Sequence, residues 1–206
     1  MPGRRGSVII ISAPSGSGKS TVVRRLLRAE PQLEFSVSYT TRPPRAHEKE
    51  GRDYHFVSVE KFKRMIAARD FAEWATIYGN YYGTSLRQIE AARRAGRDIL
   101  LDIDVQGHRN VRRRIKDAVS IFLLPPSFRE LRQRLILRHS DSPETIKRRL
   151  AAAREEIRRW PEYDYAVVND DVSQAARALR TILAAARLRR ENQEQRIRKI
   201  CKTFGG

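Results

Sequence analysis

The segment from Ser7 to Ala29 restricts the possible folds of this chain more than any other part. It begins with the β-branched run Ser7–Ser12 (SVIIIS), which has the composition of a buried parallel strand. Residues 13–18 are Gly, Ser, Pro and Ala, typical of a loop, and Lys19–Ala29 then places apolar residues at helical spacing. Because a strand, a short loop and a helix in this order open a βαβ unit, the segment predicts an α/β fold with a parallel sheet.

The same alternation returns later in the chain, after each of two interruptions. Further core elements are expected at Asp98–Ile103, Val119–Leu124 and Tyr165–Val168 (strands) and at Ser85–Ala95 and Val172–Glu191 (helices). Residues 36–88 hold short aromatic and β-branched pieces between turns, and residues 127–160 are Arg-rich and helical. We therefore predict an α/β fold whose parallel sheet, flanked by helices, comprises residues 1–35, 89–126 and 161–206. A mixed α/β insert at 36–88 and a helical insert at 127–160 interrupt it.

The loop after the first strand has a specific chemical meaning. Ala13-Pro14-Ser15-Gly16-Ser17-Gly18-Lys19-Ser20-Thr21 matches the phosphate-loop pattern G-x-x-x-x-G-K-[ST], with Ala13 in place of the first glycine. Gly16 and Gly18 allow a tight turn whose N–H groups face phosphate oxygens, and the following helix adds the positive end of its dipole. The alternative is a helix-capping loop that contains a lysine by chance. Its position between a strand and a helix favours binding of a nucleoside triphosphate.

The phosphate loop also predicts a metal site. Lys19 would bridge the β- and γ-phosphates, and the Ser20 hydroxyl would bind Mg²⁺. Such a site needs an acidic residue at the end of a neighbouring strand, and Asp102 follows three apolar residues there. If that strand continues, Asp104 points to the same face. We predict that Mg²⁺ is bound by Ser20 and, through water, by Asp102.

Further motifs follow along the chain in a fixed order. They are Phe35–Arg45 (FSVSYTTRPPR), then Glu48, Gly51, Tyr54 and Phe56; Glu73–Ala75 (EWA); Gly79–Thr84 (GNYYGT); Asp102–Gly107 (DIDVQG); and Val168–Asp171 (VNDD). Together they resemble the guanylate kinases, in the family's order and spacing, from about Val8 to about Leu183. The resemblance implies transfer of the γ-phosphoryl group of Mg-ATP to GMP, giving ADP and GDP in guanine nucleotide salvage. The two inserts would then be the nucleotide-acceptor insert and the lid.

The resemblance places GMP against side chains of the acceptor insert and one residue of the core. They are Ser38, Arg42, Arg45, Tyr54, Glu73, Tyr82, Thr84 and Asp104. Arg42 and Arg45 can clamp the dianionic monophosphate, and the hydroxyls of Tyr54 and Tyr82 can complete its cage. The Glu73 carboxylate can accept hydrogen bonds from N1–H and N2–H₂ of guanine, an edge that adenine lacks. Taken singly, each residue is more typical of an ordinary amphipathic insert than of a binding site, and only their joint order favours the base site.

The Arg-rich insert resembles the family's lid, whose arginines neutralise charge on the moving phosphoryl group. The predicted catalytic residues are Lys19, Arg42, Arg134, Arg138 and Arg149. Arg134 and Arg138 are four residues apart and share a helix face. The resemblance also places Asn169 and Asp170 near the adenine of ATP. The other arginines of this insert are interpreted as a solvated face.

Composition limits the other functions that the chain could have. Among 206 residues, 42 Lys and Arg stand against 24 Asp and Glu, a formal net charge of +18. Such a balance suits nucleic acid, highly charged small substrates or a generally basic proteome, and composition does not separate them. Because Arg is scattered through every segment, we attribute much of the excess to the third. The basic tail at 187–202 could bind nucleic acid, but we favour a solvated, fraying C-terminal helix there. The single Cys201 excludes an intramolecular disulfide and is interpreted as a bystander thiol.

Several alternatives remain at this point. No apolar run reaches the roughly 18 residues of a membrane span, so we expect a cytoplasmic protein without a membrane partner, in an oligomeric state that the sequence leaves open. A non-catalytic interaction module related to guanylate kinases would usually lack the loop lysine or the acceptor arginines, and both are present. A P-loop kinase for another acceptor is disfavoured by Glu73 and Ser38. The departures Ala13, Thr84 and His139 remove no group that the reaction needs.

Overall fold

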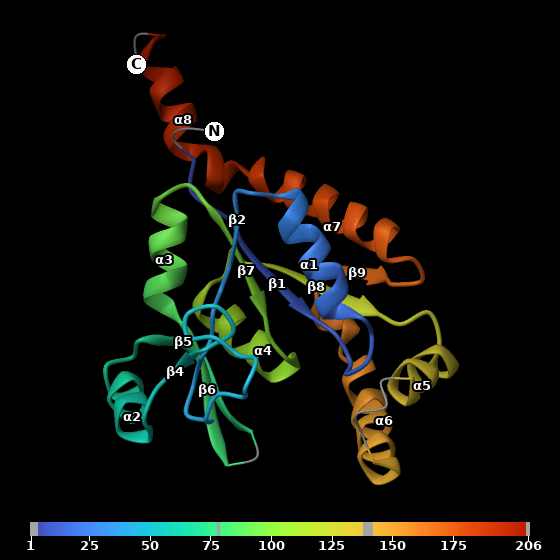
Figure 1. Cartoon of the computed structure of the whole chain (residues 1–206). Coiled ribbons are helices and arrows are strands. Elements are labelled where there is room, and N and C mark those ends of the chain that lie inside the picture. The colour runs from blue at the N-terminus through green and yellow to red at the C-terminus, as the bar shows by residue number, and fades with distance from the viewer. Residues whose placement is uncertain (1–3, 78, 138–141, 205–206) are drawn as a thin grey trace.

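The computed structural model of the protein describes residues 4–77, 79–137 and 142–204 (Figure 1). The described strands are β1 (Val8–Ser12), β2 (Leu33–Phe35), β3 (Tyr39–Thr40), β4 (His55–Phe56), β5 (Phe71–Ile77), β6 (Asn80–Ser85), β7 (Asp98–Asp102), β8 (Val119–Leu124) and β9 (Tyr165–Val168). The described α-helices are α1 (Lys19–Ala29), α2 (Val59–Ala67), α3 (Leu86–Arg94), α4 (Val105–Arg114), α5 (Phe128–Ile136), α6 (Pro143–Ile157), α7 (Val172–Arg187) and α8 (Arg190–Lys202). None of these helices is long and apolar enough to cross a membrane.

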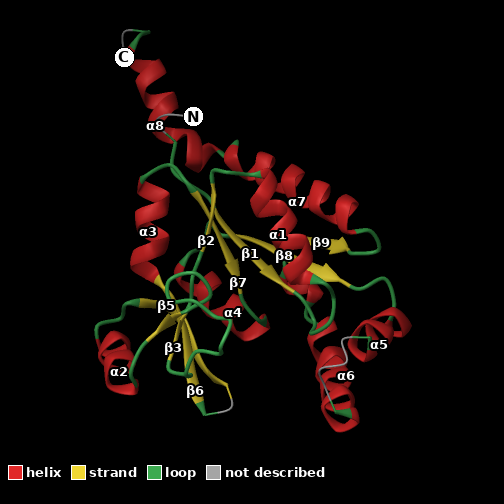
Figure 2. Cartoon of the chain, viewed as in Figure 1, coloured by secondary structure: helices red, strands yellow, loops and turns green. Residues whose placement is uncertain are grey.

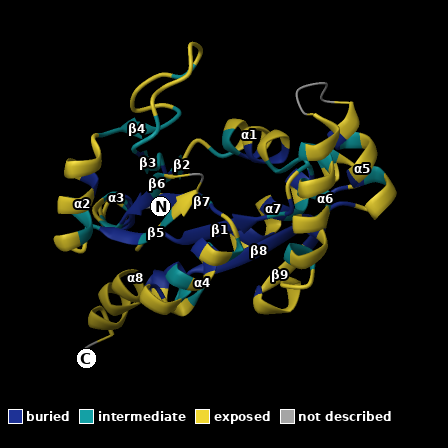
Figure 3. Ribbon diagram, turned by 90° about the horizontal axis from the view of Figure 1, so that it is seen from below, coloured by how far each residue is buried: buried dark blue, intermediate teal, exposed yellow. Residues whose placement is uncertain are grey.

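A five-stranded parallel sheet in the order β2-β7-β1-β8-β9 forms the core, which confirms the predicted fold class (Figure 2). The central strand β1 is buried throughout, as its β-branched composition predicts (Figure 3). Ile9 and Ile11 pack with α1 and α7 on one face of the sheet. Val8 and Ile10 pack with α3 and α4 on the other. Alternate residues of one strand therefore join two layers of helices.

Residues of the acceptor insert form a second sheet in the order β4-β3-β6-β5. Phe62 of α2 is fully buried there, stacked on Phe71 and Tyr81 at centroid distances of 4.4 and 5.3 Å. The helical insert has its own small core, in which Leu131 and Leu135 of α5 meet Ala153 of α6. We keep the division into a core, an acceptor insert at 36–88 and a lid at 127–160 as a proposal.

Two local expectations were wrong, both because a helix begins where none was expected. The strand expected over Asp98–Ile103 ends one residue earlier, at Asp102, and does not continue to Asp104. Asp104 is instead the N-cap of α4, with its carboxylate accepting from Gly107 N at 2.7 Å. The helix expected over Val172–Glu191 is two helices, α7 and α8, separated at residues 188 and 189. The side chain of Asn192 is buried and donates to Ser7 Oγ at 3.0 Å, so the first turn of α8 is docked on the core.

A buried ion-pair network joins the start of β1 to β7 and α7. The fully buried Asp98 carboxylate accepts two hydrogen bonds from Arg4, at 2.7 and 2.9 Å, and one from Arg187 at 2.8 Å. Arg4 is only 4% exposed. Removing one partner of such a pair leaves the other as an uncompensated buried charge, which is far more costly than losing a surface pair.

We expect Asp98→Asn to lower the free energy of unfolding by about 3–5 kcal/mol, because Arg4 loses its counter-ion. Urea unfolding at pH 7, followed by circular dichroism, measures this change. Glu155→Gln is the matched control, since Glu155 and its partner Arg158 are 72% and 73% exposed and such pairs contribute at most about 1 kcal/mol. Equal losses in the two variants would contradict the prediction.

Candidate active site

The candidate site lies at the edge of the core sheet where the parallel strands end. β1 ends at Ser12, β7 at Asp102 and β9 at Val168, all on the same edge because the strands are parallel. The loop at 13–18 leaves β1 at this edge and leads into α1. Ligands of open α/β sheets bind outside the carboxyl ends of the strands, which is where this loop lies.

The phosphate loop depends on its two glycines for its shape. Gly16 and Gly18 have φ of 93° and 84°, values that other residues rarely adopt. A Cβ on Gly16 would lie 2.9 Å from the Leu135 side chain, and one on Gly18 would lie 2.6 Å from Asn169 Nδ2. The loop is therefore packed closely between α5 and the end of β9, in a conformation that larger residues would disturb.

Lys19 and Ser20 begin α1, directly after this loop. Lys19 Nζ forms an ion pair with the carboxylate of Asp102, which lies opposite Ile11 of β1 in the neighbouring strand. Among the described residues no three or more His, Cys, Asp or Glu side chains cluster as a ready-made cation site. An Mg²⁺ ion carried by a triphosphate needs only one or two protein ligands, and the Ser20 hydroxyl and the Asp102 carboxylate are hard oxygen donors that suit it.

A cavity of about 370 Å³ lies between the two sheets, beside Asp102. Six of the eight residues predicted to bind GMP line it: Ser38, Arg45, Tyr54, Glu73, Tyr82 and Asp104. The rings of Tyr54 and Tyr82 meet edge to face with centroids 5.9 Å apart. Asp102 also lines the cavity, so the ion-paired carboxylate of the phosphate-loop region borders the predicted acceptor site.

The other two residues, Arg42 and Thr84, do not line the cavity. Each contacts a residue that does: Arg42 contacts Tyr54, and Thr84 contacts Glu73. Arg42 makes two hydrogen bonds to the Glu48 carboxylate, at 2.8 and 2.9 Å, and its guanidinium lies 5.5 Å from the centre of the Tyr54 ring. Glu48 also accepts from the backbone N–H of Arg45 at 2.9 Å. Glu48 therefore orders both predicted phosphate-binding arginines. The motif contained Glu48, but its role was not predicted, because only the folded loop brings it to Arg42.

Glu73 is a carboxylate held in an environment that disfavours its charge. Burial, together with the nearby charge of Asp104, raises the pKa of Glu73 to about 7, although its hydrogen bond with Thr84 acts in the opposite direction. The buried Thr84 hydroxyl donates to Glu73 Oε1 at 2.6 Å, and a Cβ on Gly107 would lie 3.2 Å from Oε2. Thr84 therefore orients the carboxylate, and Gly107 leaves room for it.

One predicted lid residue reaches the phosphate loop directly. Arg134 of α5 donates to the carbonyl of Ser17 at 3.4 Å and to that of Asn169 at 3.0 Å. Arg149 is half-buried on α6, and Arg138 lies outside the described residues. The roles of all three stay predictions.

Glu156, near the end of α6, was missed by sequence reasoning. Burial raises the pKa of its carboxyl, and the charge of Asp104 adds to this, whereas a hydrogen bond from the backbone N–H of Ser15 and the charge of Lys19 lower it. Its Oε2 atom is buried and has no hydrogen-bond partner among the described residues. A carboxylate of α6, in the predicted lid, therefore lies against the phosphate loop. No local sequence signal distinguishes it from the solvent-facing Glu155.

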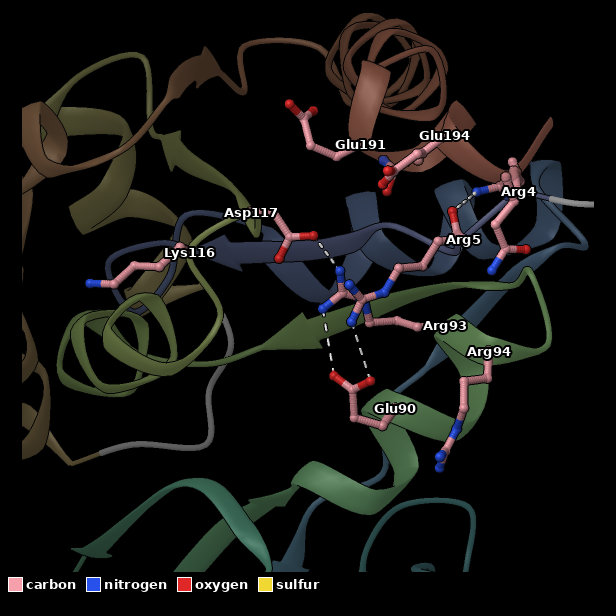
Figure 4. Close-up of a pocket in the computed structure, with 11 residues that line it drawn as sticks. Arg4, Arg5, Glu90, Arg93, Arg94, Lys116, Asp117, Glu191 and Glu194 are labelled. Atoms are coloured by element: carbon pink, nitrogen blue, oxygen red, sulfur yellow. Dashed lines mark hydrogen bonds and ion pairs between the residues drawn. The ribbon is translucent and has the colours of Figure 1, made fainter. Parts of the chain in front are cut away.

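A larger cavity, of about 700 Å³, lies at the opposite, amino-terminal end of the core strands (Figure 4). It is lined by the start of the chain, the end of α3 and the first turns of α8. Its central cation, Arg93, is buried and forms ion pairs with Asp117 and Glu90, which also binds Arg5. Because these charges are paired with one another, they are not free to bind a charged ligand. We therefore place the candidate site at the carboxyl ends of the strands.

A phosphate loop at the carboxyl edge of a parallel sheet, with a second polar cavity beside it, is the arrangement of the P-loop nucleotide kinases. The profile of the family described as "Guanylate kinase" matches residues 5–186. The chain is 53% identical over 186 residues to the guanylate kinase of Geobacter sulfurreducens, covering 90% of this chain and 92% of that one. It is 50% identical over 191 residues to the guanylate kinase of Rhizobium meliloti, covering 92% and 87%.

A solved structure shows the same similarity. The crystal structure of guanylate kinase from Anaplasma phagocytophilum resembles this fold with a TM-score of 0.74 and 35% identity, covering 92% of this chain and 90% of that one. The chain belongs to the guanylate kinase family. The helix α8 lies beyond the matched residues.

Proposed function

We propose that this protein transfers the γ-phosphoryl group of Mg²⁺-bound ATP to GMP, giving ADP and GDP, and so recycles guanine nucleotides in the cytoplasm. The observation that carries the proposal is the half-buried Glu73 carboxylate, oriented by Thr84 at 2.6 Å in a cavity that borders the ion pair of Lys19 and Asp102. The carboxylate that would recognise the base therefore lies in a cavity next to the phosphate loop. Membership of the guanylate kinase family supports the same reaction.

The donor side of the reaction is the phosphate loop. Its backbone N–H groups and the start of α1 would hold the β- and γ-phosphates of ATP, and Lys19 would leave Asp102 to bridge them. Ser20 and, through water, Asp102 would hold Mg²⁺, which supplies charge neutralisation on the triphosphate when it is bound. Arg134 lies beside the loop, with its guanidinium on the carbonyl of Ser17, and would turn from there toward the transferred group.

The acceptor side is the cavity between the two sheets. Arg42, Arg45, Tyr54 and Tyr82 would hold the phosphate of GMP, and Glu73 would accept from N1–H and N2–H₂ of the base. The acceptor phosphate oxygen is already an anion, so no general base is needed. Catalysis then consists of aligning two phosphates and balancing their charge while water is excluded.

The experiment that tests this function is an acceptor screen. ADP release from Mg-ATP is measured with GMP, AMP, CMP, UMP or no acceptor. Turnover with GMP alone supports the proposal. Turnover with a different monophosphate would retain the phosphate-loop assignment and reject the guanine site. Absence of transfer to every acceptor, in folded protein, would favour a non-catalytic interaction module.

The KM for GMP should depend on pH through Glu73. The carboxylate, not the carboxylic acid, accepts both guanine donors, and burial raises the pKa of Glu73 to about 7. We therefore expect the KM for GMP to rise up to about tenfold per pH unit below pH 7 and to level off above it. Steady-state kinetics between pH 5.5 and 8.5 measure this.

Two comparisons separate the effect of Glu73 from other titrations. The phosphate of GMP itself titrates near pH 6, and Glu73→Gln should retain only that weaker dependence. The KM for ATP serves as the internal control, since Glu73 does not line the phosphate loop. A pH profile unchanged in Glu73→Gln would show that Glu73 does not control the affinity for GMP.

A further inference from the structure

Asn169 is buried between the end of the core sheet and the phosphate loop. It follows β9 directly, and its backbone N–H donates to Leu124 O at 2.8 Å, which extends the β8–β9 pairing by one residue. Its side chain is only 1% exposed. Its Nδ2 donates to the carbonyl of Ser17 at 2.7 Å. The side chain is therefore directed at the backbone of the loop and is shielded from solvent.

The carbonyl of Ser17 is the point at which three segments meet. It accepts from Asn169 Nδ2 at 2.7 Å and from Arg134 Nη1 at 3.4 Å. Arg134 Nη2 in turn donates to the backbone carbonyl of Asn169 at 3.0 Å. The loop, the end of β9 and the lid helix α5 thus form one closed set of hydrogen bonds. The shorter of the two bonds to Ser17 comes from Asn169.

The direction of this carbonyl determines the direction of the next N–H group. The peptide unit between Ser17 and Gly18 is planar and trans, so its C=O and N–H point in opposite directions. With the Ser17 oxygen held by Asn169 on the outside of the loop, the Gly18 N–H points to the inside, where phosphate oxygens bind. A glycine such as Gly18, at φ 84°, offers little steric resistance to rotation of this peptide unit. A rotated unit would direct its carbonyl oxygen at the phosphate.

We propose that Asn169 is a positioning residue, which holds the Ser17–Gly18 peptide unit so that the Gly18 N–H faces the triphosphate. This inference rests on the proposed function and deepens its donor site. It differs from a role near the adenine, because the effect of Asn169 would pass through the loop and be independent of the base. The close approach of Asn169 Nδ2, 2.6 Å from a Cβ built on Gly18, places the amide directly against that residue.

Two variants test the proposal. Asn169→Ala removes the donor, and Asn169→Asp keeps the shape but sets a carboxylate against the Ser17 carbonyl. Binding of Mg-ATP, of inorganic tripolyphosphate with Mg²⁺ and of GMP is measured by calorimetry on the full chain. We expect Asn169→Ala to weaken the binding of ATP and of tripolyphosphate by the same factor, about tenfold. Asn169→Asp should weaken both further, and neither variant should change the affinity for GMP.

Several results would overturn the proposal. Weaker ATP binding with unchanged tripolyphosphate binding would mean that Asn169 contacts the base. Unchanged binding of both would mean that the contact with Ser17 does not position the loop, and parallel loss of GMP binding would mean a general structural defect. The control is Thr181→Ala, which removes a side-chain hydrogen bond to Arg177 O on the exposed face of α7. Because tripolyphosphate binding involves no acceptor, these outcomes are distinct from failure of the acceptor screen.

Discussion

Replacement of Lys19 by alanine is expected to lower kcat for phosphoryl transfer from ATP to GMP by about a thousandfold. Lys19 is the cation that we propose to bind the β- and γ-phosphates, and in this structure it is paired with Asp102. Preorganised charges aimed at a transition state are worth about a hundredfold to a thousandfold each. The variant also leaves the Asp102 carboxylate without its cation, which adds repulsion toward the triphosphate. The effect should therefore lie at the upper end of that range.

The measurement is ADP release at saturating GMP and varied ATP. The matched control is Arg25→Ala, since Arg25 is exposed on the same helix and away from the loop. We expect that variant to stay within about twofold of the wild-type rate. A Lys19→Ala enzyme with near-normal kcat would mean that the loop binds its ligand in another way.

Replacement of Glu73 by glutamine is expected to lower kcat/KM for GMP by a factor of about a hundred to a thousand. The carboxylate can accept from two donors of guanine, whereas the glutamine side chain presents its own donor to one of them and leaves it unpaired. Hydrogen bonds to charged groups contribute about 1.5–3 kcal/mol each and neutral ones about 0.5–1.5 kcal/mol. Loss of one charged bond and weakening of the other to a neutral one together cost about 2.5–4.5 kcal/mol, which gives a loss of this size. Discrimination against AMP should fall by a similar factor, because a polar site rejects a base that cannot satisfy it.

The same variant should be more stable than the wild type in alkaline solution. The folded-state pKa of Glu73, about 7, lies above its ordinary value of 4.5. Its contribution to stability is therefore fully present below pH 4.5 and is lost as the pH rises through 7. Because glutamine carries no charge, we expect Glu73→Gln to raise the free energy of unfolding by up to about 3 kcal/mol at pH 8.5 and to change it little at pH 4.5.

Urea unfolding at the two pH values measures this difference, and GMP kinetics on the same preparation give the functional loss. Glu194→Gln is a suitable control, because Glu194 and its partner Arg198 on α8 are 56% and 74% exposed and lie on the amino-terminal side of the sheet, away from both substrates. Equal stability of Glu73→Gln and wild type at pH 8.5 would mean that burial does not penalise this carboxylate.

Elements that follow from local pattern alone were predictable. The phosphate loop is contiguous, so its glycines, Lys19 and Ser20 can be identified from spacing, and the structure forms α1 over Lys19–Ala29 as predicted. The strands β8 at Val119–Leu124 and β9 at Tyr165–Val168 also have the predicted bounds. Alternation and β-branched composition are properties of short segments, and they do not depend on the distant neighbours of a residue.

The roles of Glu48, Glu156 and Asn169 depend on contacts across long stretches of chain. Asn169 and Ser17 are 152 residues apart in the sequence, and Arg134 and Ser17 are 117 residues apart. No spacing pattern relates residues at such sequence separations. Asp104 would have shared a face with Asp102 had the strand continued, but it is a helix cap, because Gly107 offers its N–H to the carboxylate only once α4 has formed. The order of residues thus specifies which chemical groups are present and which elements carry them. Their partners, burial and pKa values arise only when the two sheets and the lid are packed together, because each depends on atoms that other segments supply.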